Sequence, residues 1–387
     1  MKRILFVVMV VCSAVHGMAE NHVPTRIVTD ARGKMVAVPQ KINRVVTISD
    51  GLVESVMLIL GVQDTLMGVG SYCLQHTFDL SWTTEGGETF SRTGGGIPVT
   101  MLYPRIKTLP RIAMATAAPN YEEIARLKPD VMIVRVGSCW HYNDNDQAPT
   151  SIKRFESMNI PVIVLHSPNT FDSPDIETLS LEIVQIGQVF GRENRAQQVA
   201  DFLEDQARLV RERTAPVPMD KRPRVLLFGL SPGSRSEGGA GTVSGVDTIE
   251  SFFLESIVHA VNAYHYPGFF KTVGTEQILA LDPDVIILPT ALGYHPPREL
   301  YEASYYRNLR NMRAVKARRV AALPFSPCNC DKRLEYPVDI MVMAKAAYPE
   351  RFRDINMRTW LLHFYRTVYG VSEEGALGLL KAQWMDI

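Results

Sequence analysis

The chain contains one short pattern twice, and this repeat narrows the folds that it can adopt. The first copy runs from Glu122 to Ile133 (EEIARLKPDVMI) and the second from Glu276 to Ile287 (EQILALDPDVII). Each copy places apolar residues at helical spacing, then a Pro-Asp pair, then a run of apolar residues, which predicts a short helix, a turn and a buried strand. The copies lie too far apart for a solenoid, whose repeats span roughly 20–50 residues. We therefore expect two similar α/β lobes with a cleft between them.

The N-terminus has the features of a cleavable export signal. Lys2 and Arg3 provide positive charge, residues 4–15 form an apolar core, and Gly17-Met18-Ala19 is a small-x-small cleavage site that ends at Ala19. The apolar run is shorter than the roughly 18 residues that span a membrane, and no later run reaches that length. Cys12 offers lipoprotein processing as an alternative, but the large residue before it disfavours that route. We expect the signal peptide to be removed and the mature protein to act in the periplasm.

Composition limits the kinds of partner. The 41 basic and 41 acidic residues balance, which argues against a partner reached through bulk charge, so we expect no nucleic-acid ligand and no acidic membrane surface. The cysteines that remain after cleavage are Cys73, Cys139, Cys328 and Cys330. An oxidising compartment permits disulfides among them, and the pairing stays open. Cys73 and Cys139 are one candidate pair, because both follow strands of the same predicted lobe.

Hydrophobic spacing and turn residues predict the order of elements in each lobe. For the first lobe they predict, in order, a hairpin at 26–38, a strand at 44–48, a helix at 52–60 closed by Gly61, and strands at 64–70, 130–136 and 161–165. For the second lobe they predict a strand at 224–228, a helix at 247–258, a strand at 320–323, and final helices at about 334–348 and 356–369. Residues 81–100 are rich in Gly, Thr and Ser, which predicts a long loop inserted at the surface or over the cleft.

The longest helical stretch lies between the lobes, at 175–213. Gly191 divides it, and the second helix, 192–213, has apolar residues at helical spacing. The predicted organisation is a signal peptide (1–19), a first lobe (20–174), a helical linker (175–215) and a second lobe (216–387). Alternating strands and helices predict mostly parallel sheets. The predicted fold class is therefore α/β, with two Rossmann-like lobes joined by one long rigid helix.

Four stretches, in this order, resemble a known family. They are residues 44–61, 120–130, 275–284 and 343–370. The chain is similar to the periplasmic substrate-binding proteins of ABC importers for iron–siderophores, haem or vitamin B12, the class III type with a helical backbone. The resemblance implies a monomer with a ligand cleft between its lobes and no cofactor of its own beyond the metal chelate that it carries. It also implies a partner, the transmembrane permease dimer with its ATPase.

The resemblance assigns a role to one glutamate in each copy of the repeat. Glu122 and Glu276 match the exposed glutamates with which the family docks onto arginines of the permease. Two separated carboxylates on similar lobes suit a partner with two-fold symmetry, because each can form a charge-assisted hydrogen bond. The alternative is that both are solvent-exposed residues of a first helical turn, stabilised by the helix dipole.

Candidate ligand-binding residues follow from a general rule: in open α/β sheets, ligands bind beyond the carboxyl ends of the strands. The loops at these ends contain Ser49, Asp50, Tyr72, Trp140, His141 and Tyr142 in the first lobe, and Arg235, Tyr294, His295 and Arg333 in the second. The aromatic residues can stack on a flat chelate, and His141 and His295 can ligate a metal. Arg333 suits an anionic group through paired hydrogen bonds, with an ion pair to Asp331 or Glu335 as the alternative.

The expected function is capture of a metal chelate, such as an iron–siderophore, haem or a corrinoid, and its delivery to the permease. The aromatic candidates favour this large cargo, although Trp140 can instead cover the core of its lobe. A small oxyanion such as molybdate or tungstate is the alternative cargo for the same fold. An exported enzyme is disfavoured, because the chain has no nucleophile elbow, phosphate-binding loop or His-Glu-x-x-His pair.

Overall fold

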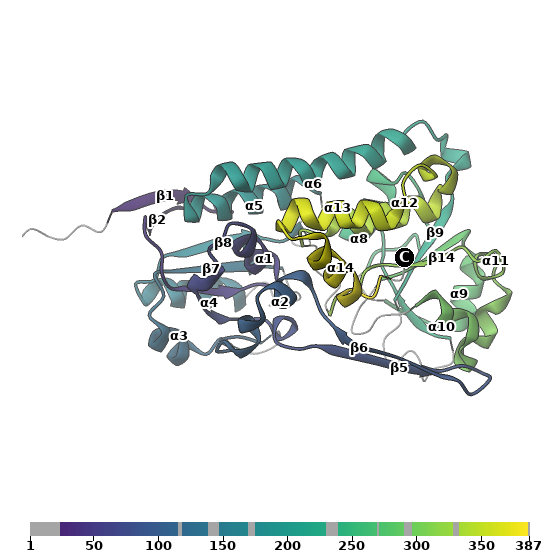
Figure 1. The fold of residues 1–387 in the computed structure, drawn as a ribbon, viewed down its shortest axis with the longest axis horizontal. Helices are drawn as coiled ribbons and strands as arrows, with labels where there is room; N and C mark the ends of the chain where they lie inside the picture. Colours follow the sequence, from purple (N-terminus) through teal and green to yellow (C-terminus); the bar gives the residue numbers. More distant parts are fainter. Residues whose placement is uncertain are drawn as a thin grey trace, which may run out of the picture.

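A computed structural model of the chain describes residues 24–114, 118–137, 147–168, 175–229, 239–268, 271–289, 296–327 and 333–385. They form two α/β lobes joined along one edge by a long helix, which confirms the predicted fold class (Figure 1). The predicted signal peptide lies outside the described residues. Within the ranges given above, no helix is both long and apolar enough to cross a membrane.

The first lobe is built on a 4-stranded parallel sheet. Its strands, in spatial order, are β4 (Leu66–Val69), β3 (Val45–Ile48), β7 (Val131–Val136) and β8 (Val162–His166). Almost all of their side chains are buried, as expected for a parallel sheet covered on both faces. The helical elements of this lobe are α1 (Leu52–Ile59), η1 (Gln63–Thr65), η2 (Tyr72–Leu74), η3 (Pro104–Thr108), α3 (Tyr121–Leu127) and α4 (Gln147–Ser157). The predicted N-terminal hairpin is confirmed as β1 (Thr25–Thr29) and β2 (Met35–Pro39).

The second lobe has a 6-stranded mixed sheet. Its parallel part consists of β9 (Arg224–Gly229), β11 (Val261–Asn262), β13 (Val285–Leu288) and β14 (Val320–Ala322). An antiparallel edge is added by β10 (Gly241–Val243) and β12 (Lys271–Val273). The helical elements are α8 (Ile249–Phe252), the π-helical turn η6 (Phe253–Ile257), α9 (Thr275–Leu281), α10 (Pro297–Glu302), η7 (Ser304–Asn311) and α11 (Arg313–Lys316).

Both copies of the repeated pattern fold as predicted, with α3 leading to β7 and α9 leading to β13. The aspartate of each Pro-Asp pair binds the start of the neighbouring strand. Asp130 Oδ2 accepts a hydrogen bond from the Arg44 amide at 3.0 Å, before β3. Asp284 Oδ2 accepts one from the Arg224 amide at 2.9 Å, at the start of β9. The repeated aspartate therefore sets the position of the central strands in both lobes.

The predicted helices between the lobes are α5 (Glu177–Phe190) and α6 (Glu193–Thr214). Gly191, which divides them, adopts a left-handed conformation with φ 62°. On one side α6 packs against α5, and on another it packs against α12 (Tyr336–Ala347). Buried apolar residues of α6 belong to one continuous core that includes members from both lobes. The bridging helix is therefore held along its length by packing, which restricts its bending.

The C-terminal region has one helix more than predicted. The two predicted helices are α12 and, after η8 (Pro349–Phe352), α13 (Met357–Tyr369); the missed helix is α14 (Glu373–Ala382). The boundary signals were present in the sequence. Gly370 ends α13 in a left-handed conformation, and the Ser372 hydroxyl caps α14 by accepting a hydrogen bond from the Gly375 amide.

The prediction of a loop at 81–100 was wrong. This segment belongs to a hairpin of β5 (Phe78–Thr83) and β6 (Thr89–Gly95), followed by α2 (Pro98–Leu102). Its Gly, Thr and Ser content suggested irregular structure, but Leu80 and Trp82 alternate with exposed polar residues and are buried. In Figure 1 the hairpin leaves the first lobe and runs to the second lobe along the edge opposite α6.

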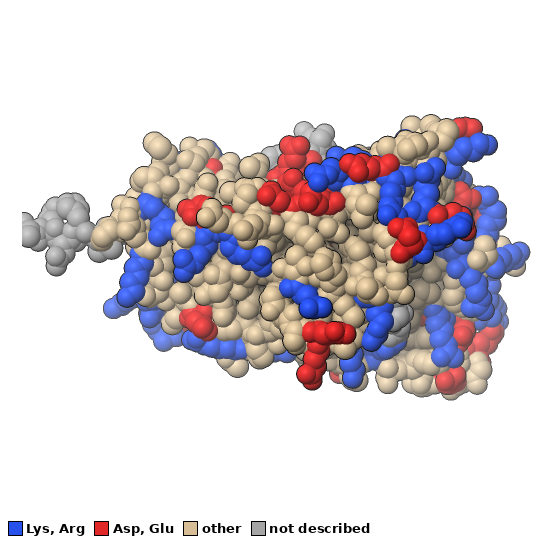
Figure 2. All heavy atoms as spheres, turned by 45° about the horizontal axis from the view of Figure 1, so that its top comes forward, with Lys and Arg blue, Asp and Glu red and all other residues tan. Residues whose placement is uncertain are grey.

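The surface carries charges of both signs. In Figure 2, many Lys and Arg side chains gather at the end of the molecule formed by the second lobe, where α6 ends with Arg211 and Arg213 in its last turn. Acidic side chains lie among them and nearer the middle of the same face. The face shown therefore has no field of a single sign along its whole length.

Candidate functional site

The carboxyl end of β3 leads into a tight turn, Ser49-Asp50-Gly51, from which α1 begins. Gly51 is the N-cap of α1 and has φ 118°, a conformation that favours glycine. Ser49 Oγ accepts hydrogen bonds from the amides of Gly51 and Val53, at 3.2 and 3.3 Å. Asp50 Oδ1 accepts one from the Leu52 amide at 3.4 Å. The turn is therefore held by its own side chains, and it places Ser49 and Asp50 at the predicted edge of the sheet.

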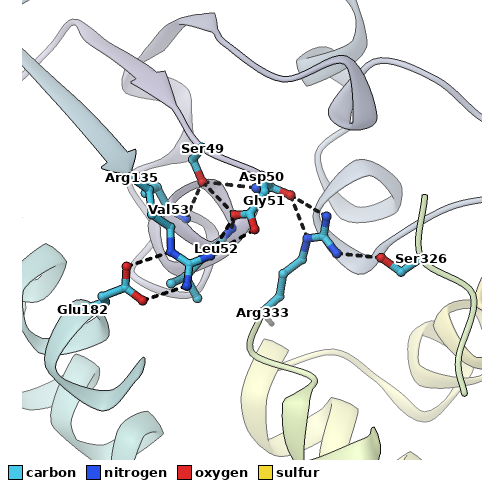
Figure 3. Close-up of polar contacts among 9 residues, drawn as sticks. All are labelled: Ser49, Asp50, Gly51, Leu52, Val53, Arg135, Glu182, Ser326 and Arg333. Atoms are coloured by element: carbon cyan, nitrogen blue, oxygen red, sulfur yellow. Dashed lines mark hydrogen bonds and ion pairs between the residues drawn. The ribbon is translucent and has the colours of Figure 1, made fainter. Parts of the chain in front are cut away.

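Asp50 belongs to a buried network of charged residues (Figure 3). Arg135, near the end of β7, donates from Nη1 to both carboxylate oxygens of Asp50, at 3.2 and 3.0 Å. The same guanidinium donates from Nε and Nη2 to the two oxygens of Glu182 on α5, at 2.7 and 2.8 Å. The side chains of Arg135 and Asp50 are 0% exposed and that of Glu182 is 2% exposed. Because buried charges are costly unless they are paired, this network holds the turn, the strand end and α5 in one arrangement.

Two carboxyl groups share one guanidinium in this network. Burial raises the pKa of Glu182 to about 7; Arg135 opposes this rise and Asp50 adds to it. Burial by itself lowers the pKa of Arg135, but the two carboxylates more than compensate and raise it above its ordinary value. One guanidinium balances only one carboxylate, so protonation of Glu182 removes the excess negative charge. The charge of the network therefore changes near neutral pH.

Arg333 reaches the same turn from the segment before α12, on the side of the second lobe (Figure 3). Its Nε and Nη2 donate to the main-chain carbonyl of Asp50 at 2.8 and 2.5 Å, and its Nη1 donates to Ser326 Oγ at 2.7 Å. The residue is only 5% exposed. A Cβ atom on Gly51 would lie 2.7 Å from Arg333 Nε, so glycine is needed for this approach. Arg333 therefore forms a direct contact between the lobes at the predicted ligand-binding turn.

The predicted residues after β4 lie at the same edge of the sheet. Tyr72 begins η2, and its side chain lies outside what the structure describes. Cys73 is a buried free thiol, whereas Cys139, its candidate disulfide partner, lies outside the described residues. Burial raises the pKa of the Cys73 thiol, and the positive charge of Arg333 reduces the rise. The thiol is therefore close enough to Arg333 for their charges to interact.

Several candidate residues lie outside the described residues, and their roles remain predictions. They are Trp140, His141, Tyr142, Arg235, Tyr294 and His295, together with Cys328 and Cys330. Among the residues that the structure does describe, no group of three His, Cys, Asp or Glu side chains is placed to hold a metal ion.

Glu122 and Glu276 occupy equivalent positions on the two lobes. Each is exposed and lies in the first turn of its helix, α3 or α9. The neighbouring Glu123 pairs with Arg126 at 2.5 Å. Figure 1 places α3 and α9 in different lobes, toward opposite ends of the molecule. Two contacts with one partner would therefore be well separated, and the docking role of these residues remains a prediction.

Sequence reasoning missed Arg135 and Glu182. A signal was present, because Arg135 interrupts the otherwise apolar strand VMIVRV, and Glu182 precedes Ile183 on the buried side of α5. A charged residue at a buried position needs a charged partner. The sequence does not show which residue that partner is, since Asp50, Arg135 and Glu182 come from three separate elements.

The comparisons with known proteins identify the class of protein. Residues 113–327 match the periplasmic binding protein family. This match spans more than half of the chain, and the protein belongs to that family. Such proteins bind a solute for the permease and ATPase of an ABC transporter, so the chain is a transport protein and not an enzyme.

Individual relatives agree on the fold and differ in cargo. The molybdate-binding protein MolA of Haemophilus influenzae is 23% identical over 368 residues, which cover 90% of this chain and 92% of MolA. The structure of MolA bound to molybdate has a TM-score of 0.64 at 20% identity, over 90% of this chain and 98% of that one. A periplasmic solute-binding protein from Veillonella parvula has a TM-score of 0.69 at 20% identity, over 94% and 99%. CeuE of Helicobacter pylori, in a nickel–histidine complex, has a TM-score of 0.62 at 13% identity, over 92% and 99%.

Proposed function

We propose that this protein captures a small oxyanion of the molybdate class between its lobes and delivers it to the permease of an ABC importer. The observation that carries the proposal is the position of Arg333, which is buried where the lobes meet, beside the Asp50-Gly51 turn. A guanidinium suits an oxyanion because it offers parallel, charge-assisted hydrogen bonds. The likeness to MolA, which covers 90% of this chain, supports the same class of cargo.

Direct contact between the lobes also favours a small cargo. Arg333 extends from the side of the second lobe to the main chain of the first. A siderophore or haem placed at this point has to separate Arg333 from Asp50. An oxyanion needs only one edge of the guanidinium, so it has to displace only the Asp50 carbonyl or Ser326 Oγ from Arg333.

A metal chelate, the cargo favoured by the sequence, is the second candidate. The similarity of the fold to that of CeuE in its nickel–histidine complex supports it. In that case Trp140, Tyr142 and Tyr294 are the residues proposed to contact the chelate, with His141 or His295 available to a metal.

The deciding experiment is a binding measurement on the purified protein. Calorimetry and thermal unfolding are recorded with molybdate, tungstate, sulfate and phosphate, and with a ferric siderophore, haem and cobalamin. We expect saturable binding of molybdate or tungstate, with a stabilisation of about 2.7 kcal/mol at roughly 100 times the Kd. The Arg333→Gln variant is expected to lose this stabilisation. Arg208→Gln, at an exposed helix position with 61% side-chain exposure, is the matched control and is expected to retain it.

Each other outcome has a defined meaning. Binding of a chelate without binding of any oxyanion moves the assignment to chelate uptake. If the wild type and Arg333→Gln bind molybdate equally well, the site at Arg333 is rejected, but an oxyanion remains the cargo. No response to either group of compounds rejects both cargoes.

Docking through Glu122 and Glu276 is the second part of the proposal, and their matched exposed positions support it. In vesicles that contain the importer, Glu122→Arg and Glu276→Arg are expected to reduce ATPase stimulation by the loaded binding protein, with cargo affinity unchanged. Glu374→Arg, at an exposed position on α14, is the control. Unaltered stimulation with both repeat variants would mean that the glutamates are ordinary surface residues.

We also propose that the mature protein works in the periplasm after cleavage behind Ala19. The charged and apolar segments of the N-terminus support this location. Intact-mass measurement of protein from a periplasmic extract is expected to show loss of residues 1–19. A lipid adduct would instead show processing at Cys12.

A further inference from the structure

The β5–β6 hairpin is a physical connection between the lobes in addition to α6. It starts after η2 of the first lobe and is followed by α2, which packs against α1 of the same lobe. Its far end pairs with the second lobe, where Thr84 forms an antiparallel bridge with Ala303 and the Glu85 amide donates to the Glu302 carbonyl at 2.9 Å. A strand the length of β5 spans roughly 20 Å.

Apolar side chains anchor the hairpin in the core of the second lobe. Leu80 and Trp82 are 7% and 6% exposed and belong to the same cluster as Phe228, Leu300 and Tyr306. The two hairpin side chains are therefore part of the second lobe's hydrophobic core, although both neighbouring chain segments return to the first lobe. Removing the hairpin from this position exposes them to water.

The base of the hairpin is also closely packed. A Cβ atom on Gly95 would lie 2.7 Å from the Trp384 ring and 3.0 Å from Phe325. The next amide, of Gly96, donates to the Ala382 carbonyl at 3.1 Å, which fixes the hairpin to the end of α14. The hairpin is thus bound to other elements at both of its ends.

Charged contacts hold the tip of the hairpin. Glu85 forms ion pairs with Arg307 at 2.9 Å and with Arg310 at 2.6 Å. The guanidinium of Arg298 lies 3.6 Å from the centre of the Phe90 ring and 3.4 Å from Glu88. All of these arginines belong to the second lobe, so each contact crosses between lobes.

We propose that the β5–β6 hairpin is a second tether, which together with α6 holds the two lobes at a fixed separation. Figure 1 shows α6 and the hairpin along opposite edges of the molecule. Rotation of the lobes about α6 therefore moves the hairpin tip relative to its contacts, and a large rotation withdraws Trp82 from the core of the second lobe. With both connections in place, the lobes move apart only after the hairpin detaches. The inference goes beyond the proposed function, and it is tested on the protein without cargo.

The test is a distance measurement between the lobes of the full mature protein without cargo. The residues at positions 125 and 280 are replaced by a ketone-bearing amino acid, and a nitroxide label is attached to each ketone. The native cysteines therefore stay unchanged. Both positions are exposed alanines on the repeat helices, Ala125 on α3 and Ala280 on α9. Pulsed electron–electron double resonance is recorded for the wild type, Trp82→Ala, Trp82→Phe and Leu80→Ala.

We expect one narrow distance distribution for the wild type. In Trp82→Ala and Leu80→Ala, a longer-distance population is expected to appear, and Trp82→Phe is expected to restore most of the narrow distribution. Glu123→Ala removes an exposed ion pair within the first lobe and is expected to match the wild type. Should Trp82→Ala fail to fold, Leu80→Ala decides the question, because it removes a smaller side chain from the same cluster.

Two results overturn the tether. One is a broad distribution in the wild type, which would show that the lobes already move freely. The other is a distribution in folded Trp82→Ala or Leu80→Ala that coincides with the wild type. Since no cargo is present, neither result depends on whether the protein binds an oxyanion or a chelate.

Discussion

The two copies of the repeat differ little in local structure. The helix α3 is capped by Asn120, whose side chain accepts a hydrogen bond from the Glu123 amide at 3.0 Å. The helix α9 is capped from the other direction: the Gln277 side chain accepts one from the Gly274 amide at 3.1 Å. Each helix ends at a residue with left-handed backbone before the Pro-Asp pair. Similar sequence therefore produced the same unit twice.

The lobes differ at the end of each repeat unit and beyond it. In the first lobe, β7 continues to Arg135, which pairs with Asp50 and Glu182 in the buried network of charged residues. In the second lobe, β13 is entirely apolar and ends before Pro289. The second lobe contributes Arg333 instead, from a segment far beyond its repeat. The comparison shows that a shared scaffold contributes differently from each lobe to the candidate site: the buried network of Asp50, Arg135 and Glu182 from the first lobe, and Arg333, which contacts the Asp50 carbonyl, from the second.

The largest expected effect tests the buried network of Asp50, Arg135 and Glu182. Arg135→Met leaves Asp50 and Glu182 buried without their guanidinium, and we expect a loss of about 3–5 kcal/mol in the free energy of unfolding. Combining it with Asp50→Asn and Glu182→Gln is expected to recover part of the loss, because the uncompensated charges are then gone. Denaturant unfolding measures both. If Arg135→Met alone lowers the free energy of unfolding by less than about 0.5 kcal/mol, the stability of the buried network does not depend on its charge balance.

The second test compares glycines that cap a helix in each lobe. Gly51→Ala places a Cβ atom 2.7 Å from Arg333 Nε at φ 118°. We expect backbone strain to lower the free energy of unfolding by about 1–3 kcal/mol, and cargo binding to become weaker. Gly274→Ala is the matched control, because φ is −79° and no atom lies within 4 Å of the added carbon. Its cost is expected to stay below about 1 kcal/mol, and equal effects at the two positions would contradict the special fit of Gly51.

The third test uses pH. The pKa of Glu182 is raised to about 7 in the folded protein, from an ordinary value of 4.5. The folded state therefore holds this proton more tightly, so the stabilisation is complete below about pH 4.5 and is lost as the pH rises through 7. Between pH 5 and 8, we expect the free energy of unfolding of the wild type to fall by roughly 1–3 kcal/mol relative to that of Glu182→Gln. Parallel stability curves for the two proteins would rule out this titration.

The smallest expected difference lies between the repeated aspartates. Asp130 accepts hydrogen bonds from two main-chain amides, of Asn43 and Arg44, whereas Asp284 accepts one from Arg224. We expect Asp130→Ala to lower the free energy of unfolding by about 1–2 kcal/mol, and Asp284→Ala by about half as much. Thermal unfolding of the two variants side by side measures the difference. A larger loss for Asp284→Ala would mean that its exposed ion pair with Arg313, at 3.1 Å, contributes more than such pairs usually do.

Sequence patterns determined the local elements of this protein. The spacing of apolar residues and the positions of Gly and Pro placed most of the parallel strands, the division at Gly191 and the bridging helix, but not β11, which has only two residues. The repeat predicted two lobes, and the rule for strand ends selected the turn that contains Asp50 and, in the other lobe, Arg333. These features are encoded within short windows, because helix spacing, strand burial and turn geometry depend mainly on neighbours in the chain.

Only the tertiary structure decided which distant residues meet. Arg135 was visible as a charge in an apolar strand, but its partners Asp50 and Glu182 come from other elements. The hairpin was mistaken for a loop because Leu80 and Trp82 are buried by the second lobe, not by residues near them in sequence. Burial and ion pairing are set by whatever the fold brings within a few ångströms, and the composition of a segment carries no record of those neighbours.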